Sequence, residues 1–121
     1  MRKLMVVDDE KPILDLFEVI QEVCDFRIIA ESCTGEDAIE TYSTMKIKPD
    51  VIIMDQRMPD MDGVEATKRI LSIDKSAKIL FVSGDPLSEE KALEAGAIGF
   101  LEKPFGLKEL SAAIDKALKE K

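Results

Sequence analysis

Short apolar runs alternate with stretches of helical periodicity along the whole chain. The apolar runs predict strands near residues 3–7, 26–32, 49–55, 78–83 and 98–103. Most of the runs contain consecutive apolar residues, such as Leu4 to Val7 and Val51 to Met54, which is typical of strands that are buried on both faces of a parallel sheet. We therefore predict an α/β fold, a doubly wound (βα)5 domain with helices on both faces of a five-stranded parallel sheet.

Two of the predicted helices have a clear apolar stripe at helical spacing. The stripe of the first helix, which opens near Pro12, consists of Ile13, Leu14, Phe17, Ile20 and Val23. The stripe of the last helix consists of Leu107, Leu110, Ile114 and Leu118, and its C-terminal part carries Lys116, Lys119 and Lys121.

Capping residues mark the ends of the other helices. Thr34 followed by Asp37 resembles a capping box at the start of the second helix. The third helix is expected to begin after Asp62-Gly63. Ser88 is a candidate N-cap for the fourth helix and Gly96 a candidate stop.

Three carboxylates follow two of the apolar runs. Asp8 and Asp9 come directly after the first run, and Asp55 ends the third. Because the carboxyl ends of parallel strands meet at one edge of a sheet, we expect these acids to lie together. Close carboxylates repel unless a cation compensates them. Hard oxygen ligands in a chain without histidine favour Mg²⁺ or Mn²⁺ over zinc.

The last two runs end in groups of different chemistry. Ser83 places a hydroxyl after the fourth run, and Lys103, followed by Pro104, places an ammonium after the fifth. Carboxylates, a hydroxyl and an ammonium at one edge make a candidate pocket for a phosphoryl group.

Composition and charge narrow the function classes. A chain of 121 residues that is 45% hydrophobic and 35% charged suits one globular domain, residues 1–121. The net charge of −8 argues against direct nucleic-acid binding, which depends on clustered Lys and Arg. Cys24 and Cys33 are too few for a disulfide framework and fit a reducing cytoplasm. No apolar stretch is long enough for a membrane helix or a signal peptide.

The segment from Val51 to Gly63, VIIMDQRMPDMDG, closely resembles the phosphoacceptor segment of two-component response regulator receiver domains. Asp8-Asp9, Ser83 and Lys103-Pro104 fall at the places that this family expects, so the resemblance covers nearly the whole chain. It implies a flavodoxin-like sheet of strand order 2-1-3-4-5, which is carried over from the family.

The resemblance implies a role for each acid. Asp55 is expected to be the nucleophile that receives a phosphoryl group as an acyl phosphate. Asp9 is expected to bind the metal directly and Asp8 mostly through water, with Asp55 and the backbone carbonyl of Arg57 completing the protein ligands. The structural alternatives are a strand-end acid that caps a turn, for Asp55, and a helix cap, for Asp8 or Asp9.

The resemblance also implies roles for the polar groups opposite Asp55. Lys103 is expected to contact Asp55 and later a phosphoryl oxygen, and the Lys103-Pro104 bond is often cis in the family. The hydroxyl of Ser83 and the backbone N–H of Gly84 are expected to donate to the phosphoryl group. A solvated strand-end lysine and a turn serine are the alternatives.

Three further residues have roles implied by the family. Phe100 is expected either to swing between two rotamers as Ser83 moves or simply to pack in the core. Arg57 and Asp85 are expected to flank the route of the attacking water and to tune the lifetime of the acyl phosphate.

The resemblance implies a phosphoacceptor domain that takes its phosphoryl group from a histidine kinase or a histidine phosphotransfer protein. Its output surface is expected to be the fourth helix, fifth strand and fifth helix, read by a partner protein. As a monomer or phosphorylation-dependent dimer, it would catalyse only its own phosphorylation and dephosphorylation.

One alternative function is that of an aspartyl-nucleophile phosphohydrolase of small substrates, which usually has its nucleophile at the first strand. Another is a flavodoxin-like cofactor carrier, disfavoured because Asp8-Asp9-Glu10 repels phosphate.

Overall fold

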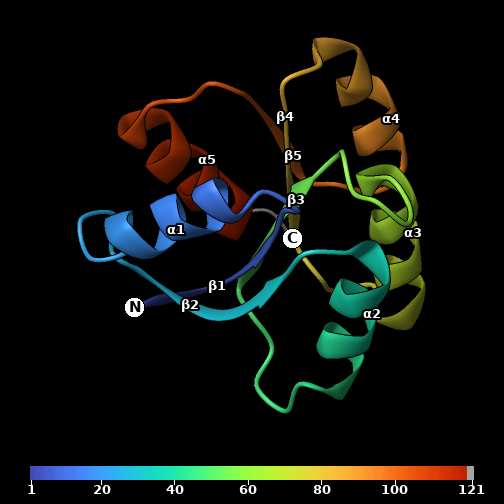
Figure 1. The fold of residues 1–121 in the computed structure, drawn as a ribbon. Helices are drawn as coiled ribbons and strands as arrows, with labels where there is room; N and C mark the ends of the chain where they lie inside the picture. The colour runs from blue at the N-terminus through green and yellow to red at the C-terminus, as the bar shows by residue number, and fades with distance from the viewer. Residues whose placement is uncertain (120–121) are drawn as a thin grey trace.

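The computed structural model describes residues 1–119 and contains one parallel sheet of order β2-β1-β3-β4-β5 (Figure 1). The predicted fold and strand order are therefore confirmed. The strands are β1 (Arg2–Val7), β2 (Phe26–Ser32), β3 (Val51–Asp55), β4 (Ile79–Ser83) and β5 (Gly99–Glu102). The helices are α1 (Lys11–Ile20), α2 (Gly35–Thr44), α3 (Gly63–Ile73), the short 3₁₀ helix η1 (Pro86–Ser88), α4 (Glu89–Glu94) and α5 (Leu107–Lys119).

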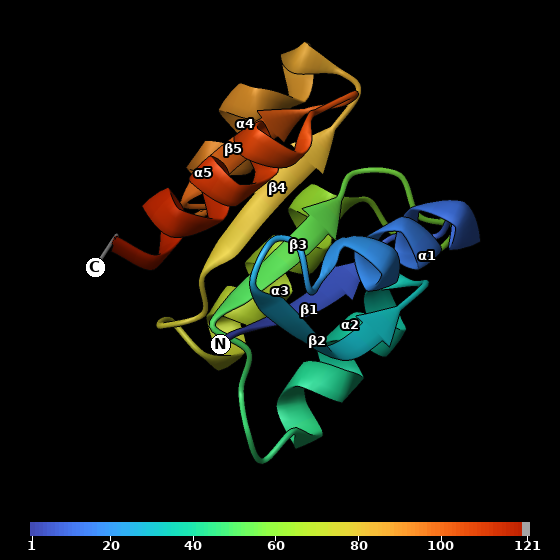
Figure 2. The same ribbon diagram turned by 90° about the vertical axis from the view of Figure 1, so that its left-hand side faces the viewer.

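The register of the sheet brings the strand ends together. Val7 at the end of β1 lies beside Met54, and Asp55 at the end of β3 lies beside Val82. Figure 2 shows that the arrowheads of the strands point toward one end of the molecule. The residues that directly follow β1, β3 and β4 therefore share one edge of the sheet, as expected for parallel strands.

Two helical layers cover the sheet, which explains why the strands are apolar at successive positions. Side chains of a strand alternate between the two faces. Leu4 and Val6 face the layer of α1 and α5, whereas Met5 and Val7 face the layer of α2, α3 and α4 (Figure 1). All four of these side chains are fully buried. Two separate hydrophobic clusters thus fix the position of the carboxyl edge.

The predicted stripes of the first and last helices are each wrong at one position. Val23 is 75% exposed, because α1 ends at Ile20 and the chain turns before β2 through Asp25, a non-glycine residue with φ of 55°. Cys24 is the buried residue of this turn. Leu107 is 44% exposed, as are its neighbours in the first turn of α5, and the buried stripe of this helix begins at Leu110. Of the lysines predicted near the end of α5, Lys121 lies outside the described residues.

The predicted capping residues have mixed outcomes. Thr34 caps α2, since its side chain accepts a hydrogen bond from the backbone of Asp37. Asp62 caps α3, which begins at Gly63 itself. Ser88 occupies the N-cap position of α4 without a side-chain cap, because its hydroxyl donates to the carbonyl of Asp85. None of the helices within residues 1–119 is both long enough and apolar enough to pass through a membrane.

Candidate functional site

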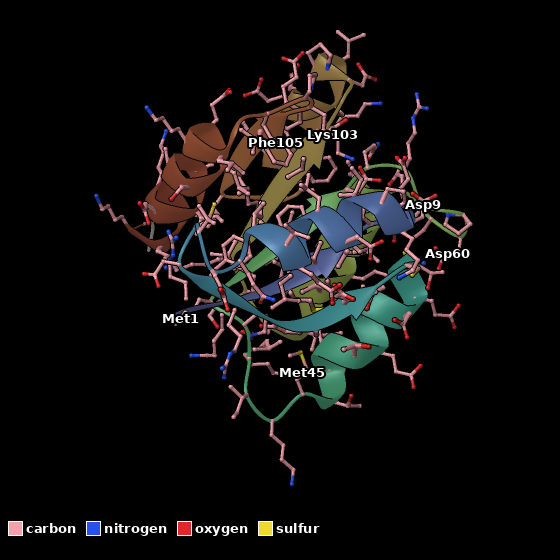
Figure 3. The ribbon with its side chains drawn as sticks, turned by 60° about the vertical axis from the view of Figure 1, so that its left-hand side comes forward. Met1, Asp9, Met45, Asp60, Lys103 and Phe105 are labelled. Atoms are coloured by element: carbon pink, nitrogen blue, oxygen red, sulfur yellow. The ribbon has the colours of Figure 1, made fainter. Side chains whose placement is uncertain are left out.

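A cleft of about 600 Å³ opens at the carboxyl edge of the sheet. Figure 3 shows Asp9, Asp60 and Lys103 toward this end of the molecule, and Met1 and Met45 toward the other. The cleft is lined by Glu10, Asp55, Gln56, Arg57, Met58, Asp62, Ser83, Gly84, Asp85 and Lys103. Four segments that are distant in the sequence thus meet at one place.

A three-residue ion network lies at the centre of the site. The Lys103 Nζ donates to Asp55 Oδ1 at 2.9 Å and to Asp8 Oδ2 at 3.2 Å. Both carboxylates are buried, while the lysine side chain is 21% exposed. The predicted convergence of Asp8, Asp55 and Lys103 is therefore present. The Lys103-Pro104 peptide bond is cis, as the family resemblance implied.

The surroundings perturb the pKa of both partners in this network. Burial raises the pKa of Asp55, and the charges of Asp8 and Asp9 act in the same direction against the opposing effect of Lys103. Burial alone would lower the pKa of Lys103, but its bonds to Asp55 and Asp8 outweigh burial and raise it. One ammonium thus compensates several acids only in part, and the site has capacity for a further cation.

A carboxylate cluster next to this network could hold a metal ion. One oxygen from each of Asp8, Asp9 and Glu10 lies within 4.8 Å of the others. All are hard oxygen ligands of the kind that Mg²⁺ prefers. Asp8 also accepts a hydrogen bond from the backbone N–H of Glu10 at 2.9 Å, which orients its carboxylate. Asp9 does not line the cleft with Asp55, but lines an adjacent pocket.

The polar groups after β4 form the opposite wall. Ser83 is buried, and its Oγ accepts a hydrogen bond from the backbone N–H of Asp85 at 3.0 Å. The serine therefore has the turn role that was one alternative. The hydroxyl itself donates to the carbonyl of Asp85 at 3.5 Å, a long and weak bond that a stronger acceptor in the cleft can replace. The backbone N–H of Lys103 donates to the Ser83 carbonyl at 2.9 Å, which ties the end of β4 to the lysine.

Phe100 does not line the cleft. It lies on β5, partly buried, and its ring stacks on that of Phe81 with centroids 6.2 Å apart and an interplanar angle of 16°. Its position in this structure is that of core packing. Phe105, near the other face, packs against Phe17 of α1. Of these aromatic residues, Phe105 thus joins the loop after Lys103 to α1, whereas Phe81 and Phe100 pack strand against strand.

The structure adds residues that the sequence reasoning missed. Glu10 follows Asp8-Asp9 directly, and this adjacency was an available signal. Gly63 supports the site from behind: a Cβ at this position would lie 2.2 Å from the carbonyl oxygen of Asp55. Gln56, Met58 and Asp62 also line the cleft, and no local pattern distinguishes them.

Comparison with known proteins agrees with this geometry. Residues 4–115 match the model of the response regulator receiver domain. The chemotaxis protein CheY of Listeria monocytogenes is 36% identical over an alignment of 121 positions, which covers 98% of this chain and all of that protein. A protein-glutamate methylesterase/protein-glutamine glutaminase of Methanococcoides burtonii is 40% identical over 118 residues, which cover 92% of this chain but 32% of that protein.

A solved structure shows the same likeness in three dimensions. The CheX-CheY-BeF3-Mg²⁺ complex from Borrelia burgdorferi matches with a TM-score of 0.90 and 25% identity, over 98% of this chain and 90% of that one. The order of the strands and the position of the acids thus agree with the match in sequence. The chain belongs to the family of response regulator receiver domains, the phosphoacceptor modules of two-component signalling.

Proposed function

We propose that Asp55 accepts a phosphoryl group from a phosphohistidine of a histidine kinase or a histidine phosphotransfer protein. The observation that supports this most directly is the pairing of a buried carboxylate with Lys103 at 2.9 Å inside an open cleft. Since residues 1–121 contain no histidine, the phosphohistidine comes from outside this domain. The relatives named CheY support the same class of chemistry.

The transfer forms one bond and breaks another. A carboxylate oxygen of Asp55 attacks phosphorus, the bond between phosphorus and the imidazole nitrogen breaks, and the imidazole leaves with the bonding electron pair. The product is an acyl phosphate, which water later hydrolyses to restore the carboxylate. Arg57 and Asp85, exposed on the cleft wall, are placed to affect the approach of that water.

Mg²⁺ or Mn²⁺ fits the acidic side of the cleft. Asp8, Asp9 and Asp55, with the backbone carbonyl of Arg57, are the proposed ligands, and Glu10 adds a nearby carboxylate. When bound, the metal reduces the repulsion between the attacking carboxylate and the phosphoryl oxygens. The Borrelia complex, whose name includes Mg²⁺ and the group BeF3, supports this assignment.

Lys103, Ser83 and Gly84 are the proposed phosphoryl contacts. The ammonium of Lys103 already faces Asp55, so it can pass from the carboxylate to a phosphoryl oxygen without leaving the site. Ser83 can donate its hydroxyl proton while Oγ keeps the bond to Asp85. The backbone N–H of Gly84, exposed on the cleft wall, is a further donor.

We infer that phosphorylation changes the face formed by α4, β5 and α5. If Ser83 moves toward the phosphoryl group, Phe100 on the neighbouring strand can repack, and a partner that prefers the new arrangement shifts the population toward it. Leu87 and Leu93 are exposed near this face.

The kinase is expected to dock at α1 and the loop around Phe105. Proposed partners are therefore a kinase or phosphotransfer protein and a downstream target, and the domain acts as a monomer or a phosphorylation-dependent dimer.

The phosphohydrolase alternative is not favoured. Its nucleophile usually follows the first strand, whereas Asp55 ends the third. We propose that the domain, residues 1–121, catalyses only its own phosphorylation and dephosphorylation. We also propose a cytoplasmic location, which suits the free thiols of Cys24 and Cys33.

Intact-mass measurement with a small acyl-phosphate donor tests this proposal. The wild type with Mg²⁺ should gain one phosphoryl group, and chelator should abolish the adduct. Asp55→Asn should gain none, because an amide is not a nucleophile for this transfer. An adduct of equal size on Asp55→Asn would assign the acceptor to another residue. Rapid multiple-turnover hydrolysis of generic phosphomonoesters by the wild type would instead support the phosphohydrolase function.

A further inference from the structure

The loop between β3 and α3, residues 56–62, carries Arg57 and forms one wall of the cleft. Its base is closed at the start of α3: the backbone N–H of Gly63 donates to the carbonyl of Gln56 at 2.9 Å, and that of Val64 donates to Gln56 Oε1 at 3.2 Å. These bonds fix where the loop leaves and rejoins the secondary structure, but they do not reach its tip.

The tip is attached to a different helix by Asp60. Its Oδ1 accepts from the N–H of Gly35 at 2.9 Å, and its Oδ2 accepts from the N–H of Glu36 at 2.8 Å. These N–H groups belong to the first turn of α2, where backbone donors lack partners within the helix and a negative charge is favoured. The backbone donors of Glu36 and Gly35 accordingly lower the pKa of Asp60.

A packing contact joins the same two segments independently of these hydrogen bonds. A Cβ at Gly35 would lie 2.4 Å from Cγ of Met61, so the Met61 side chain rests directly on the start of α2. The helix itself is firmly placed. Ala38 and Tyr42 are buried against the sheet layer, and the Tyr42 hydroxyl donates to Asp74 at 2.6 Å. The first turn of α2 is therefore a rigid support for the loop.

We propose that Asp60 is a positioning residue for the acceptor site, because it holds the loop so that the Arg57 carbonyl stays in place for the metal. This inference rests on the proposed function. Arg57 lies between the two attachments, the base at Gln56 and the tip at Asp60, and has neither a buried side chain nor a hydrogen bond of its own among those found in residues 1–119. Releasing the tip leaves the carbonyl held from one side only.

Thr34 provides a matched control. Its Oγ1 accepts from the N–H of Asp37 at 3.0 Å, so it caps the same first turn of α2 but has no bond to the loop. Asp60→Ala and Thr34→Val should both weaken the start of α2 and lower Tm. Only Asp60→Ala should also release the loop. Asp60→Asn should fall between, because its amide can accept from one N–H while its NH₂ group faces the other.

Two measurements separate the variants. Isothermal titration calorimetry with Mg²⁺ alone should show the dissociation constant rising about tenfold in Asp60→Ala, the order found when a supporting contact of a metal ligand is lost. The initial rate of phosphorylation by the acyl-phosphate donor should fall at least as much. Thr34→Val should leave both unchanged, and amide NMR spectra should confirm that each variant is folded.

The outcomes distinguish this inference from the proposed function. If Asp60→Ala and Thr34→Val bind Mg²⁺ with the affinity of the wild type, Asp60 is only a helix cap and the inference is overturned. Equal losses in both variants would overturn it as well, since they would trace the effect to α2 stability. If Asp60→Ala does not fold, Asp60→Asn provides the same comparison. Failure of the wild type to accept phosphate would count against Asp55 as acceptor, while the Mg²⁺ titration would still test Asp60.

Discussion

Asp55 and Asp60 lie on one short segment and have opposite electrostatic surroundings. Asp55 is 6% exposed, has one ammonium partner, Lys103, and lies close enough to Asp8 to be repelled by it. Asp60 is exposed and accepts hydrogen bonds from three backbone N–H groups, those of Gly35, Glu36 and Met61. The pKa of Asp55 is accordingly raised and that of Asp60 lowered.

The difference teaches how one side chain can serve either stability or reactivity. A carboxylate that keeps contact with water and faces oriented N–H groups strengthens the fold when it is ionised. A carboxylate that is buried among other acids weakens the fold when it is ionised, and a bound cation relieves that repulsion in part. The Asp55 cleft therefore has the electrostatics expected of a reactive site, and the Asp60 junction those of a support.

The largest effect is expected from Lys103→Met, which removes the one ammonium that pairs with Asp55 and Asp8. Phosphorylation should slow about 100-fold, the order found when a donor to a developing charge is lost. Stability should fall by about 3 kcal/mol, because two buried carboxylates lose their cation. Urea unfolding and intact-mass kinetics measure both quantities.

Lys11→Met is the control for charge removal. Lys11 pairs with Asp15 at 3.3 Å on the exposed surface of α1, where such a pair contributes about 0.5 kcal/mol or less. Similar losses of stability in Lys11→Met and Lys103→Met would contradict the distinction between buried and exposed acids, because the cleft charges would then depend on their cation no more than surface charges do.

A smaller but still large effect is expected from Gly63→Ala. Its new Cβ would lie 2.2 Å from the Asp55 carbonyl oxygen, a backbone atom that cannot move without displacing the end of β3. Stability should fall by about 2 kcal/mol, as for an overpacked core site, and phosphorylation should slow because the acceptor is displaced.

Gly84→Ala is the counterpart in the same cleft. No atom lies within 4 Å of its Cβ, so its stability should change by less than about 0.5 kcal/mol. Equal destabilisation would show that the backbone behind Asp55 is not closely packed.

The strands and the meeting of Asp8, Asp55 and Lys103 could be predicted from the sequence because both follow from local patterns. A run that is apolar at every position is compatible with burial on both faces, and parallel strands bring their carboxyl ends together whatever the loops do. The start of β3 was placed two residues early, at 49 instead of Val51. Pro49 has no N–H to donate to the sheet.

The supports of the site could not be predicted, because their partners are distant in the sequence. Asp60 and Gly35 are separated by 25 residues, and the close approach of Gly63 to Asp55 depends on how α3 docks. Helical spacing likewise could not show that Val23 lies beyond the end of α1 or that Leu107 is exposed in the first turn of α5. Local pattern specifies which face is apolar, but tertiary packing decides which apolar residues the core covers.

The smallest effects, and the most direct test of the comparison, are the pH dependences of Asp55→Asn and Asp60→Asn in chelator. The folded state raises the pKa of Asp55 above its ordinary value of 3.8, so ionised Asp55 destabilises the fold, fully above the folded pKa and not at all below 3.8. Asp55→Asn should thus be more stable than the wild type at neutral pH, and this gain should vanish as the pH falls through the raised pKa.

For Asp60 the sign is reversed. Its folded pKa lies below the ordinary 3.8, so its ionised form contributes stability that is complete above 3.8 and is lost as the pH falls through the folded pKa. Asp60→Asn should therefore be less stable than the wild type at neutral pH, and the deficit should close only at a lower pH than the one where the gain of Asp55→Asn disappears. Tm measured across the acid range for all three proteins tests both curves. Two curves of the same sign would mean that the burial of Asp55 and the backbone donors around Asp60 do not determine how each carboxylate contributes to stability.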